Sequence, residues 1–249
     1  MNFIYNSPLK LNIPCLPFGI KKPLVQKPNL QINNDGFATN PIYDKFGTKV
    51  DIEQAAKNSP RIMAIMDKYS LPLKVNINEL ENLKQGHMRE TRIVAAKIYS
   101  ALPEELKKEV NLPALQEAAM FHDYGKVLIP EEILNKKGRL TPLEREVMEN
   151  HSEFGYELLK NKGLSEKTLN LIKHHHQNLK STGYPQVEKD FKYDIDSQIL
   201  NVADKYTALR EKRSYKSPIA KYEAFEIIAK DVNDGNISQE VYTALIKGV

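Results

Sequence analysis

The sequence predicts an all-α protein. Between residues 51 and 249, apolar residues recur at intervals of three and four, which is the spacing of one helix face. Several of these segments start with a capping residue followed by proline or, three residues on, by glutamate, and Thr141-Pro142-Leu143-Glu144 has both. The sequence has no strand-like alternation, internal repeat or glycine-rich phosphate loop. We therefore expect helices packed around one core.

The composition narrows the class of function. With 41% hydrophobic and 27% charged residues, the chain is an ordinary globular protein. The net charge of +4 suits a small anionic ligand and falls short of the strong basic bias expected of a dedicated nucleic-acid binder, although the charge does not settle the partner. A single cysteine, Cys15, excludes a disulfide framework and a cysteine zinc cluster, so any metal must be bound by histidine and carboxylate. No apolar run is long enough to span a membrane, and we expect a cytoplasmic protein without a membrane partner.

Residues 1–50 differ from residues 51–249. The first fifty hold six of the fourteen prolines and no sustained hydrophobic period, which predicts an irregular or disordered leader. The helical domain is expected to begin with one segment capped by Asp51 and another that starts at Ser59-Pro60. A long helix should then run from Asn78 to Leu102. Later helices are expected at 111–123, 141–158, 165–176 and through 199–207, then from Ser217-Pro218 and from about 238.

The stretch Phe121-His122-Asp123-Tyr124-Gly125-Lys126 is the most informative one. Helical spacing continues the apolar stripe of Leu115 and Ala118 into His122, so this imidazole should face the core, with Asp123 at the edge of the stripe. We expect Gly125 to end the helix in a left-handed conformation, which would let Lys126 return over the site. Two alternatives stay open: a hydrogen-bonded core histidine at 122 and an ordinary surface lysine at 126.

The other histidines follow a similar pattern. His87 and His151 lie on the apolar stripes of their helices, and His175 and His176 occupy adjacent rows at the end of theirs. Asp204 lies four residues after a buried leucine, where its carboxylate could complete a metal site. The alternative is a solvated histidine cluster at a helix C-terminus, which describes His174 best.

These residues supply enough nitrogen and oxygen ligands for two metal ions, with Asp123 as the natural bridge. A ligand set without sulfur suits iron, manganese or another divalent transition metal. Two such ions can activate water and bind a phosphate, which is the chemistry of phosphoester hydrolysis. Lys126 could stabilise charge on the phosphate or protonate the departing oxygen.

In combination, several motifs resemble the HD-GYP branch of the HD-domain phosphohydrolases. They span roughly residues 78 to 230 and comprise His87, His122-Asp123-x-Gly125-Lys126, Ile129-Pro130, Leu140-Thr141, His151 with Gly155, His175-His176, Gly183-Tyr184-Pro185 and Val202-Ala203-Asp204. The resemblance implies a helical HD-domain bundle that hydrolyses cyclic di-GMP to linear pGpG, and in some members on to GMP, by attack of a metal-activated hydroxide on phosphate.

The resemblance also implies residue roles. The metal ligands would be His87, His122, Asp123, His151, His175, His176 and Asp204, holding two ions of iron or manganese. Lys126 would be catalytic together with Asp123. Arg213 and Lys216, nine and twelve positions after Asp204, would bind phosphate. Tyr184 and Pro185 would shape the substrate side, the alternative being a mere turn.

Three departures from the family pattern stand out. Gln177 replaces the glutamate after the histidine pair, Lys180-Ser181 replaces Asp-Gly, and Leu83 stands where members with three metals have a glutamate. Leu83 therefore indicates two ions rather than three. Two alternative functions stay open, namely hydrolysis of another cyclic dinucleotide or a nucleotide, and a non-catalytic module that binds a cyclic dinucleotide for signalling. A homodimer stays open as the assembly.

Overall fold

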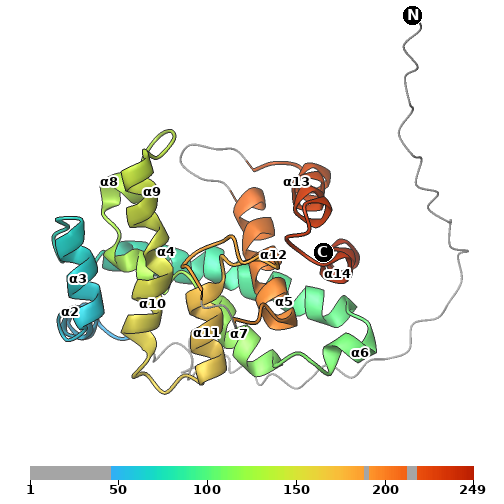
Figure 1. Ribbon diagram of the computed structural model, residues 1–249, viewed down its shortest axis with the longest axis horizontal. Coiled ribbons are helices and arrows are strands. Elements are labelled where there is room, and N and C mark those ends of the chain that lie inside the picture. Colours follow the sequence, from blue (N-terminus) through green and yellow to red (C-terminus); the bar gives the residue numbers. More distant parts are fainter. Residues whose placement is uncertain (1–45, 188–190, 212–217) are drawn as a thin grey trace, which may run out of the picture. The chain divides into compact units, whose positions relative to one another are not determined.

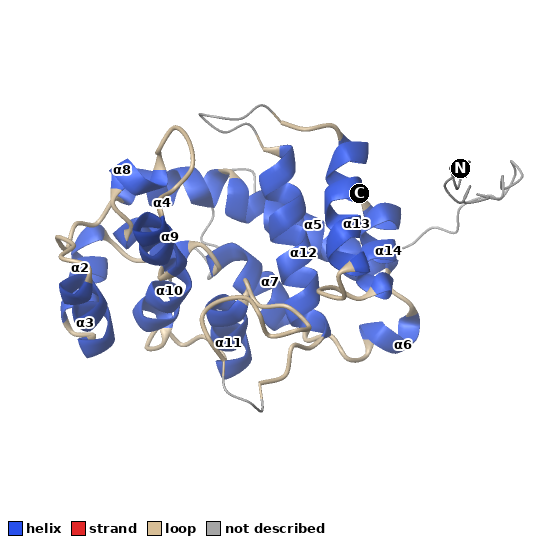
Figure 2. Cartoon of the chain, turned by 45° about the horizontal axis from the view of Figure 1, so that its top comes forward, coloured by secondary structure: helices blue, strands red, loops and turns tan. Residues whose placement is uncertain are grey.

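The described part of the chain is helical. The computed structural model describes residues 46–187, 191–211 and 218–249, and these form helices and loops without a strand (Figures 1 and 2). The expected all-α class is confirmed. The elements are α2 (Lys49–Lys57), α3 (Pro60–Lys68), α4 (Ile77–Gln85), α5 (His87–Ala101), α6 (Glu104–Lys107), α7 (Leu112–Phe121), the 3₁₀ helix η1 (Tyr124–Leu128), α8 (Glu131–Leu134), α9 (Pro142–Glu149), α10 (His151–Leu159), α11 (Glu166–His174), α12 (Ile195–Arg210), α13 (Lys221–Asn233) and α14 (Gln239–Gly248).

These helices belong to a unit that spans Pro41–Val249. Most of the expected leader, residues 1–45, lies outside the described residues. So does Ser217, the expected start of the helix after α12. The described helix in that region begins later, at Lys221, after Ala220 as its N-cap.

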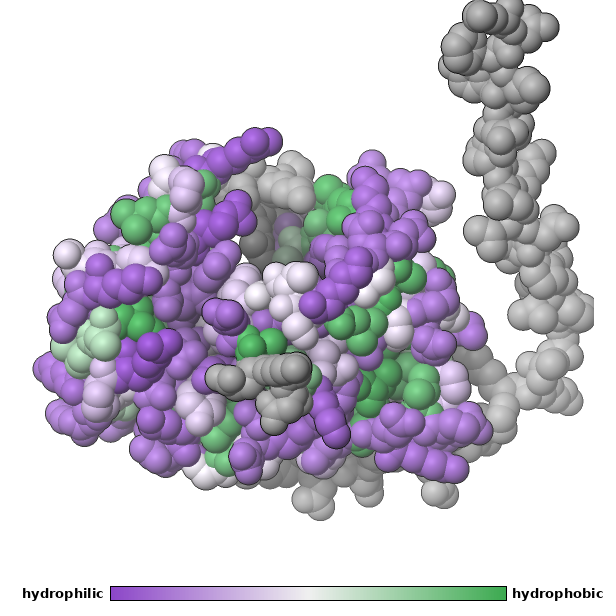
Figure 3. All heavy atoms as spheres, in the orientation of Figure 1, coloured by the Kyte–Doolittle hydropathy of each residue, from purple (hydrophilic) through white to green (hydrophobic). Residues whose placement is uncertain are grey.

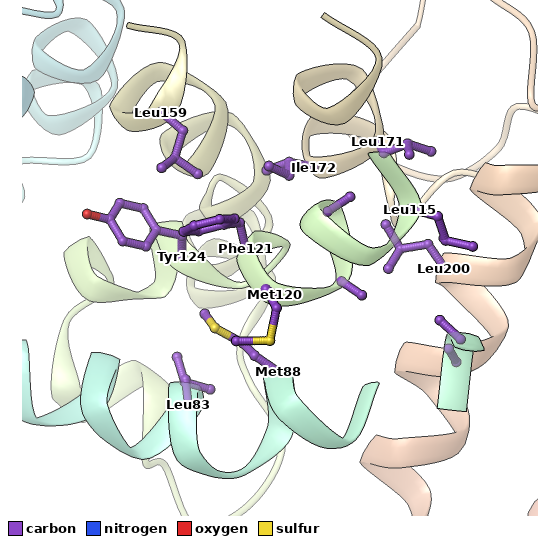
Figure 4. Packing of buried hydrophobic residues seen from close by; sticks show 14 of the residues in the cluster. Leu83, Met88, Leu115, Met120, Phe121, Tyr124, Leu159, Leu171, Ile172 and Leu200 are labelled. Atoms are coloured by element: carbon purple, nitrogen blue, oxygen red, sulfur yellow. The ribbon is translucent and has the colours of Figure 1, made fainter. Parts of the chain in front are cut away.

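Helix α5 is the central element of the unit. It packs against α4, α7, α12 and α14. Its buried residues recur at helical spacing and include His87, Met88, Thr91, Val94, Ala95 and Ile98. In Figure 4, Met88 from α5 and Met120 from α7 point toward each other, and neither side chain is exposed. Apolar burial of this kind contributes about 25 cal/mol per Å² and fixes the helices that carry the polar residues described below.

The long helix expected from Asn78 to Leu102 is in fact two helices. The chain breaks between α4 and α5 at Gly86, whose φ of −104° and ψ of −101° are not helical. The first helix is capped by Asn76, whose side chain accepts a hydrogen bond from the amide of Glu79. Because of the break, His87 is the first residue of α5 rather than a residue in the middle of a helix.

Some of the helix caps agree with the sequence, whereas the cap of α2 differs. Ser59 and Thr141 cap α3 and α9 as expected, and Thr141 completes a capping box with Glu144. The expectation that Asp51 caps α2 is wrong. Thr48 is the cap, and the carboxylate of Asp51 accepts the Thr48 amide at 2.8 Å from the third helical position.

The helix expected over 141–158 is divided by a turn at Asn150 into α9 and α10. Helical spacing puts Leu143 and Val147 on one apolar stripe that we expect to face inward, yet only Val147 is buried and Leu143 is 62% exposed. Among the described elements, α9 packs mainly on its neighbours α8 and α10. Its first turn therefore lies beyond the core.

An aromatic cluster supports the end of α7. Phe46 is 2% exposed, and its ring centroid lies 4.6 Å from that of Phe121 and 5.6 Å from that of Tyr124. The Tyr124 hydroxyl donates a hydrogen bond to the Phe46 carbonyl. Residues just before α2 thus pack beside the stretch that contains His122 and Asp123.

The face of the molecule seen in Figure 3 is mainly hydrophilic, with smaller hydrophobic areas between. No helix in the described ranges combines the length and the apolar character needed to cross a membrane.

Candidate metal centre

All seven predicted metal ligands converge. They come from separate elements: His87 begins α5, His122 caps the end of α7 and Asp123 follows it, His151 begins α10, His175 and His176 follow α11, and Asp204 lies in α12. The side chains of His87, His122, Asp123, His151 and His175 are at most 3% exposed. Helix ends thus supply most of the centre, since a side chain at a helix end can point into a cavity without interrupting the packed helix face.

Three of the imidazoles are oriented by their own backbone. Nδ1 of His122 lies 3.0 Å from the carbonyl oxygen of Ala119, and Nδ1 of His151 lies 2.8 Å from that of Met148. His175 repeats the pattern with the carbonyl of Ile172, at 2.7 Å. A carbonyl only accepts hydrogen bonds, so Nδ1 carries the proton in each case and Nε2 is left with a lone pair directed at the centre.

The ligands form two groups. His87, His122 and Asp204 make one, and His151, His175 and His176 make the other, with the ligand atoms of each group within 4.8 Å of one another. In the first, Nε2 of His87 lies 2.8 Å from Oδ1 of Asp204. In the second, Nε2 of His151 lies 3.2 Å from Nε2 of both His175 and His176.

Asp123 lies between the two groups. Its Oδ1 is 3.4 Å from Nε2 of His151, whereas its Oδ2 is 3.5 Å from Nε2 of both His87 and His122. One carboxylate oxygen therefore faces each group. Lys126 does return over the site, and its Nζ is 2.6 Å from Oδ2 of Asp123.

The expected left-handed conformation of Gly125 is wrong. Helix α7 ends at Phe121, and Gly125 lies within η1 without a positive φ. The residue is constrained by space, because an added Cβ would lie 1.9 Å from the His151 carbonyl oxygen and 2.4 Å from the Gly155 amide nitrogen. Glycine therefore lets η1 touch α10, which places Asp123 and Lys126 beside His151.

The chain after α11 also differs from its prediction. The helix ends at His174, so His175 and His176 are not in a continuing helix as expected. Instead, His176 pairs with Tyr184 in a single antiparallel bridge, and their ring centroids are 4.5 Å apart. The Tyr184-Pro185 peptide is cis. His174 belongs to neither ligand group, in line with its omission from the predicted set.

Two amide side chains stabilise the segment after α11 that contains His175 and His176. The fully buried Gln177 donates a hydrogen bond from Nε2 to the Pro185 carbonyl at 2.5 Å. Asn201 donates from Nδ2 to the carbonyls of His175 and Gln177, at 2.9 and 3.2 Å. Sequence reasoning missed Asn201. Its position three residues before Asp204, on the same face of α12, was the available signal.

Burial and charge set the protonation of the centre. Burial lowers the pKa of His151 to about 3 and that of His176 to about 4, and it lowers the pKa of His175 well below its ordinary value. These rings are neutral at pH 7 and can donate a lone pair. Burial alone would also lower the pKa of His87, but the carboxylates of Asp204 and Glu211 raise it to about 9.

The two aspartates are ionised. Burial would raise the pKa of Asp123, but the Lys126 ammonium and the neighbouring imidazoles hold it well below its usual range. For Asp204, burial is likewise outweighed by His122 and His87, and its pKa is also well below the ordinary value. The centre therefore presents anionic oxygens beside the neutral nitrogens of His151, His175 and His176.

This arrangement fits a transition-metal ion. Nε2 of His122 is buried and makes no hydrogen bond to a described residue. A buried nitrogen acceptor without a partner costs free energy unless a ligand binds it. Imidazole and carboxylate ligands suit divalent transition metals. Each of the two groups of side chains described above could thus hold an ion. The expected phosphate-binding residues Arg213 and Lys216 lie outside the described ranges.

Comparisons with known proteins agree with this description. A cyclic di-GMP phosphodiesterase from Thermotoga maritima is 36% identical over 141 residues, which cover 56% of this chain and 38% of the relative. A 3′3′-cGAMP-specific phosphodiesterase from Vibrio cholerae is 28% identical over 151 residues, covering 59% of this chain and 35% of the relative. The chain thus matches well under half the length of either protein.

A solved structure supports the fold. It is described as an HDG"Y"P protein from Bdellovibrio bacteriovorus, and it matches with a TM-score of 0.50 and 16% identity over 82% of this chain and 65% of its own. The family model described as HD domain matches residues 74–241, which include every predicted metal ligand. The resemblance noted in the sequence is confirmed, and the chain belongs to the HD domain family.

Proposed function

We propose that this protein is a metal-dependent phosphodiesterase that hydrolyses a cyclic dinucleotide, with cyclic di-GMP as the substrate and linear pGpG as the first product. GMP would be the product of a second cleavage. The observation that carries the proposal is Asp123, whose two oxygens each face one group of histidines. The relatives named cyclic di-GMP phosphodiesterases support the choice of substrate.

The centre would hold two divalent ions, iron or manganese. His87, His122 and Asp204 would bind one ion, His151, His175 and His176 the other, and Asp123 would bridge them. When bound, such ions lower the pKa of water and bind the oxygens of a phosphate. Leu83 in place of a further carboxylate favours two ions over three.

Lys126 is the proposed proton donor. Its side chain is only 17% exposed and is held against Asp123 by a charge-assisted hydrogen bond. From there the ammonium can stabilise negative charge on phosphate and give a proton to the departing oxygen. Tyr184 and Pro185, beside His176, would shape the substrate side, and Arg213 and Lys216 would bind phosphate.

A second candidate is hydrolysis of another cyclic dinucleotide. It is favoured by the relative named as a 3′3′-cGAMP-specific phosphodiesterase and by Gln177, which departs from the family glutamate. The non-catalytic alternative is a module that binds the dinucleotide and signals through a partner. The two groups of candidate ligands and the contact between Lys126 and Asp123 support catalysis over binding alone.

A turnover assay separates these functions. Purified protein loaded with iron or manganese would be incubated with cyclic di-GMP, 3′3′-cGAMP, cyclic di-AMP and mononucleotides, and the products separated by chromatography. Linear pGpG as the fastest product supports the proposal, and faster cleavage of 3′3′-cGAMP supports the second candidate. Saturable binding without product from any substrate would refute catalysis. Elemental analysis of the same sample gives the metal and its stoichiometry.

The other sequence expectations remain predictions. They are a cytoplasmic location, the absence of membrane and polymeric nucleic-acid partners, a possible homodimer, and the division into a leader over 1–50 and a helical domain over 51–249. Size-exclusion chromatography with light scattering would test the homodimer.

A further inference from the structure

His87 is the one ligand histidine of the first group that begins its helix. In His122 and His151, Nδ1 donates a hydrogen bond to the carbonyl oxygen of the residue three positions earlier. For His87 that residue is Lys84, which belongs to α4, and the chain changes direction between them at Gly86. Nδ1 of His87 is buried and makes no hydrogen bond of good geometry to a described residue. The ring thus lacks the backbone anchor that orients the other histidines.

Glu211 lies where that anchor is missing. It is the C-cap residue of α12, seven positions after Asp204, so both carboxylates project from one face of the helix two turns apart. Its Oε2 is 3.3 Å from Nδ1 of His87, on the ring edge opposite the metal-facing Nε2. A small rotation of the carboxylate at this distance gives a hydrogen bond.

The packing around Glu211 favours the same role. Oε1 lies 3.4 Å from the position that a Cβ would occupy at Gly86, so the carboxylate packs beside the residue at which the helix breaks. The Glu211 side chain is 33% exposed and that of His87 is 3% exposed. The contact therefore joins a shielded ring to a carboxylate at the edge of the centre.

We propose that Glu211 is a positioning residue that holds the His87 imidazole through Nδ1, so that Nε2 is directed at the ion bound with His122 and Asp204. This inference rests on the proposed two-metal function. A histidine that binds metal commonly donates a hydrogen bond from its other ring nitrogen to a carboxylate or carbonyl. Loss of that partner lowers the metal affinity by roughly 10–100-fold. Glu211 would supply for His87 what backbone carbonyls supply for the other ligands.

The test is a titration of the metal-free full chain with Mn²⁺, with free Mn²⁺ followed by electron paramagnetic resonance. Glu211→Ala should weaken the binding of one ion by roughly 10–100-fold and leave the second ion almost unchanged. Glu211→Gln should keep most of the affinity, since its amide oxygen still accepts from Nδ1. The matched control is Glu53→Ala in α2, which removes a glutamate that is 35% exposed and paired with Lys49. It should bind both ions as the wild type does.

Thermal melting of each metal-free variant verifies that the fold is intact before affinities are compared. Wild-type affinity in Glu211→Ala would overturn the inference, and so would an equal loss in Glu211→Gln, because the role assigned to Glu211 is hydrogen-bond acceptance. Failure of the wild-type protein to bind Mn²⁺ at all is a separate outcome. It would refute the proposed metal centre itself.

Discussion

Replacing Gly125 by alanine should damage the centre from a position that binds no metal. The new Cβ would lie 1.9 Å from the His151 carbonyl oxygen, whereas real Cβ contacts are essentially never shorter than 3.0 Å. The backbone of η1 or α10 must therefore move by about 1 Å. Overpacking of this kind costs about 1–3 kcal/mol. In a chain of this size, each kcal/mol lowers Tm by roughly 2–4 °C.

The effect on metal binding should be larger than the effect on stability. His151 begins α10 at the point of the clash, and its Nε2 must stay near both Asp123 and His175. Functional geometry tolerates displacements of only about 0.5 Å. We therefore expect Gly125→Ala to lower Tm by roughly 2–12 °C and to weaken Mn²⁺ binding at least tenfold.

Gly163→Ala is the matched control. Gly163 follows α10 with a φ of +72° and has open space around its Cβ position. Its substitution should cost about 1 kcal/mol through backbone conformation and leave Mn²⁺ binding unchanged. Both variants would be measured by differential scanning calorimetry and by Mn²⁺ titration. Wild-type Tm and Mn²⁺ affinity in Gly125→Ala would refute the steric reasoning.

Three further predictions concern the ligands, the substrate and the support of α12. His122→Ala and Asp123→Ala should each lose bound metal and activity together, and wild-type activity in both variants would reject the assignment of the centre. Arg213→Ala should mainly raise KM, and an unchanged KM would argue against a phosphate role. Asp194→Ala removes the cap of α12, which accepts the Ser197 amide at 3.1 Å, and should cost about 0.5–2 kcal/mol in urea unfolding. Although burial raises the pKa of Asp194, Lys167 and the Ser197 amide together lower it below 3.8. The folded state therefore gains stability from this group above pH 3.8 and loses it as the pH falls further, so the difference between wild type and variant should be smaller at pH 2 than at pH 7.

Local sequence rules placed most of the helices, because caps and apolar periods act within a few residues. They failed where a packing constraint was not local. The pattern from Asn78 to Leu102 is periodic throughout, yet Gly86 divides it, and His87 contacts Asp204 of α12 from the start of the second helix. Similarly, Gly125 was expected to end a helix by its φ. The structure instead requires a glycine there because of a contact with His151, which is 26 positions away in the sequence.

The sequence by itself determined which residues are candidate ligands. With six histidines, one cysteine and a set of specific motifs, it limited any metal site to imidazole and carboxylate and pointed to the HD domain family. Only the tertiary structure decided how these residues are divided between two groups, with one oxygen of Asp123 facing each. The same holds for the hydrogen bond from Asn201 to the His175 carbonyl and for the position of Glu211 beside His87. The physical reason is that such distances depend on the packing of α5, α10 and α12 against their neighbours, which no window of local sequence contains.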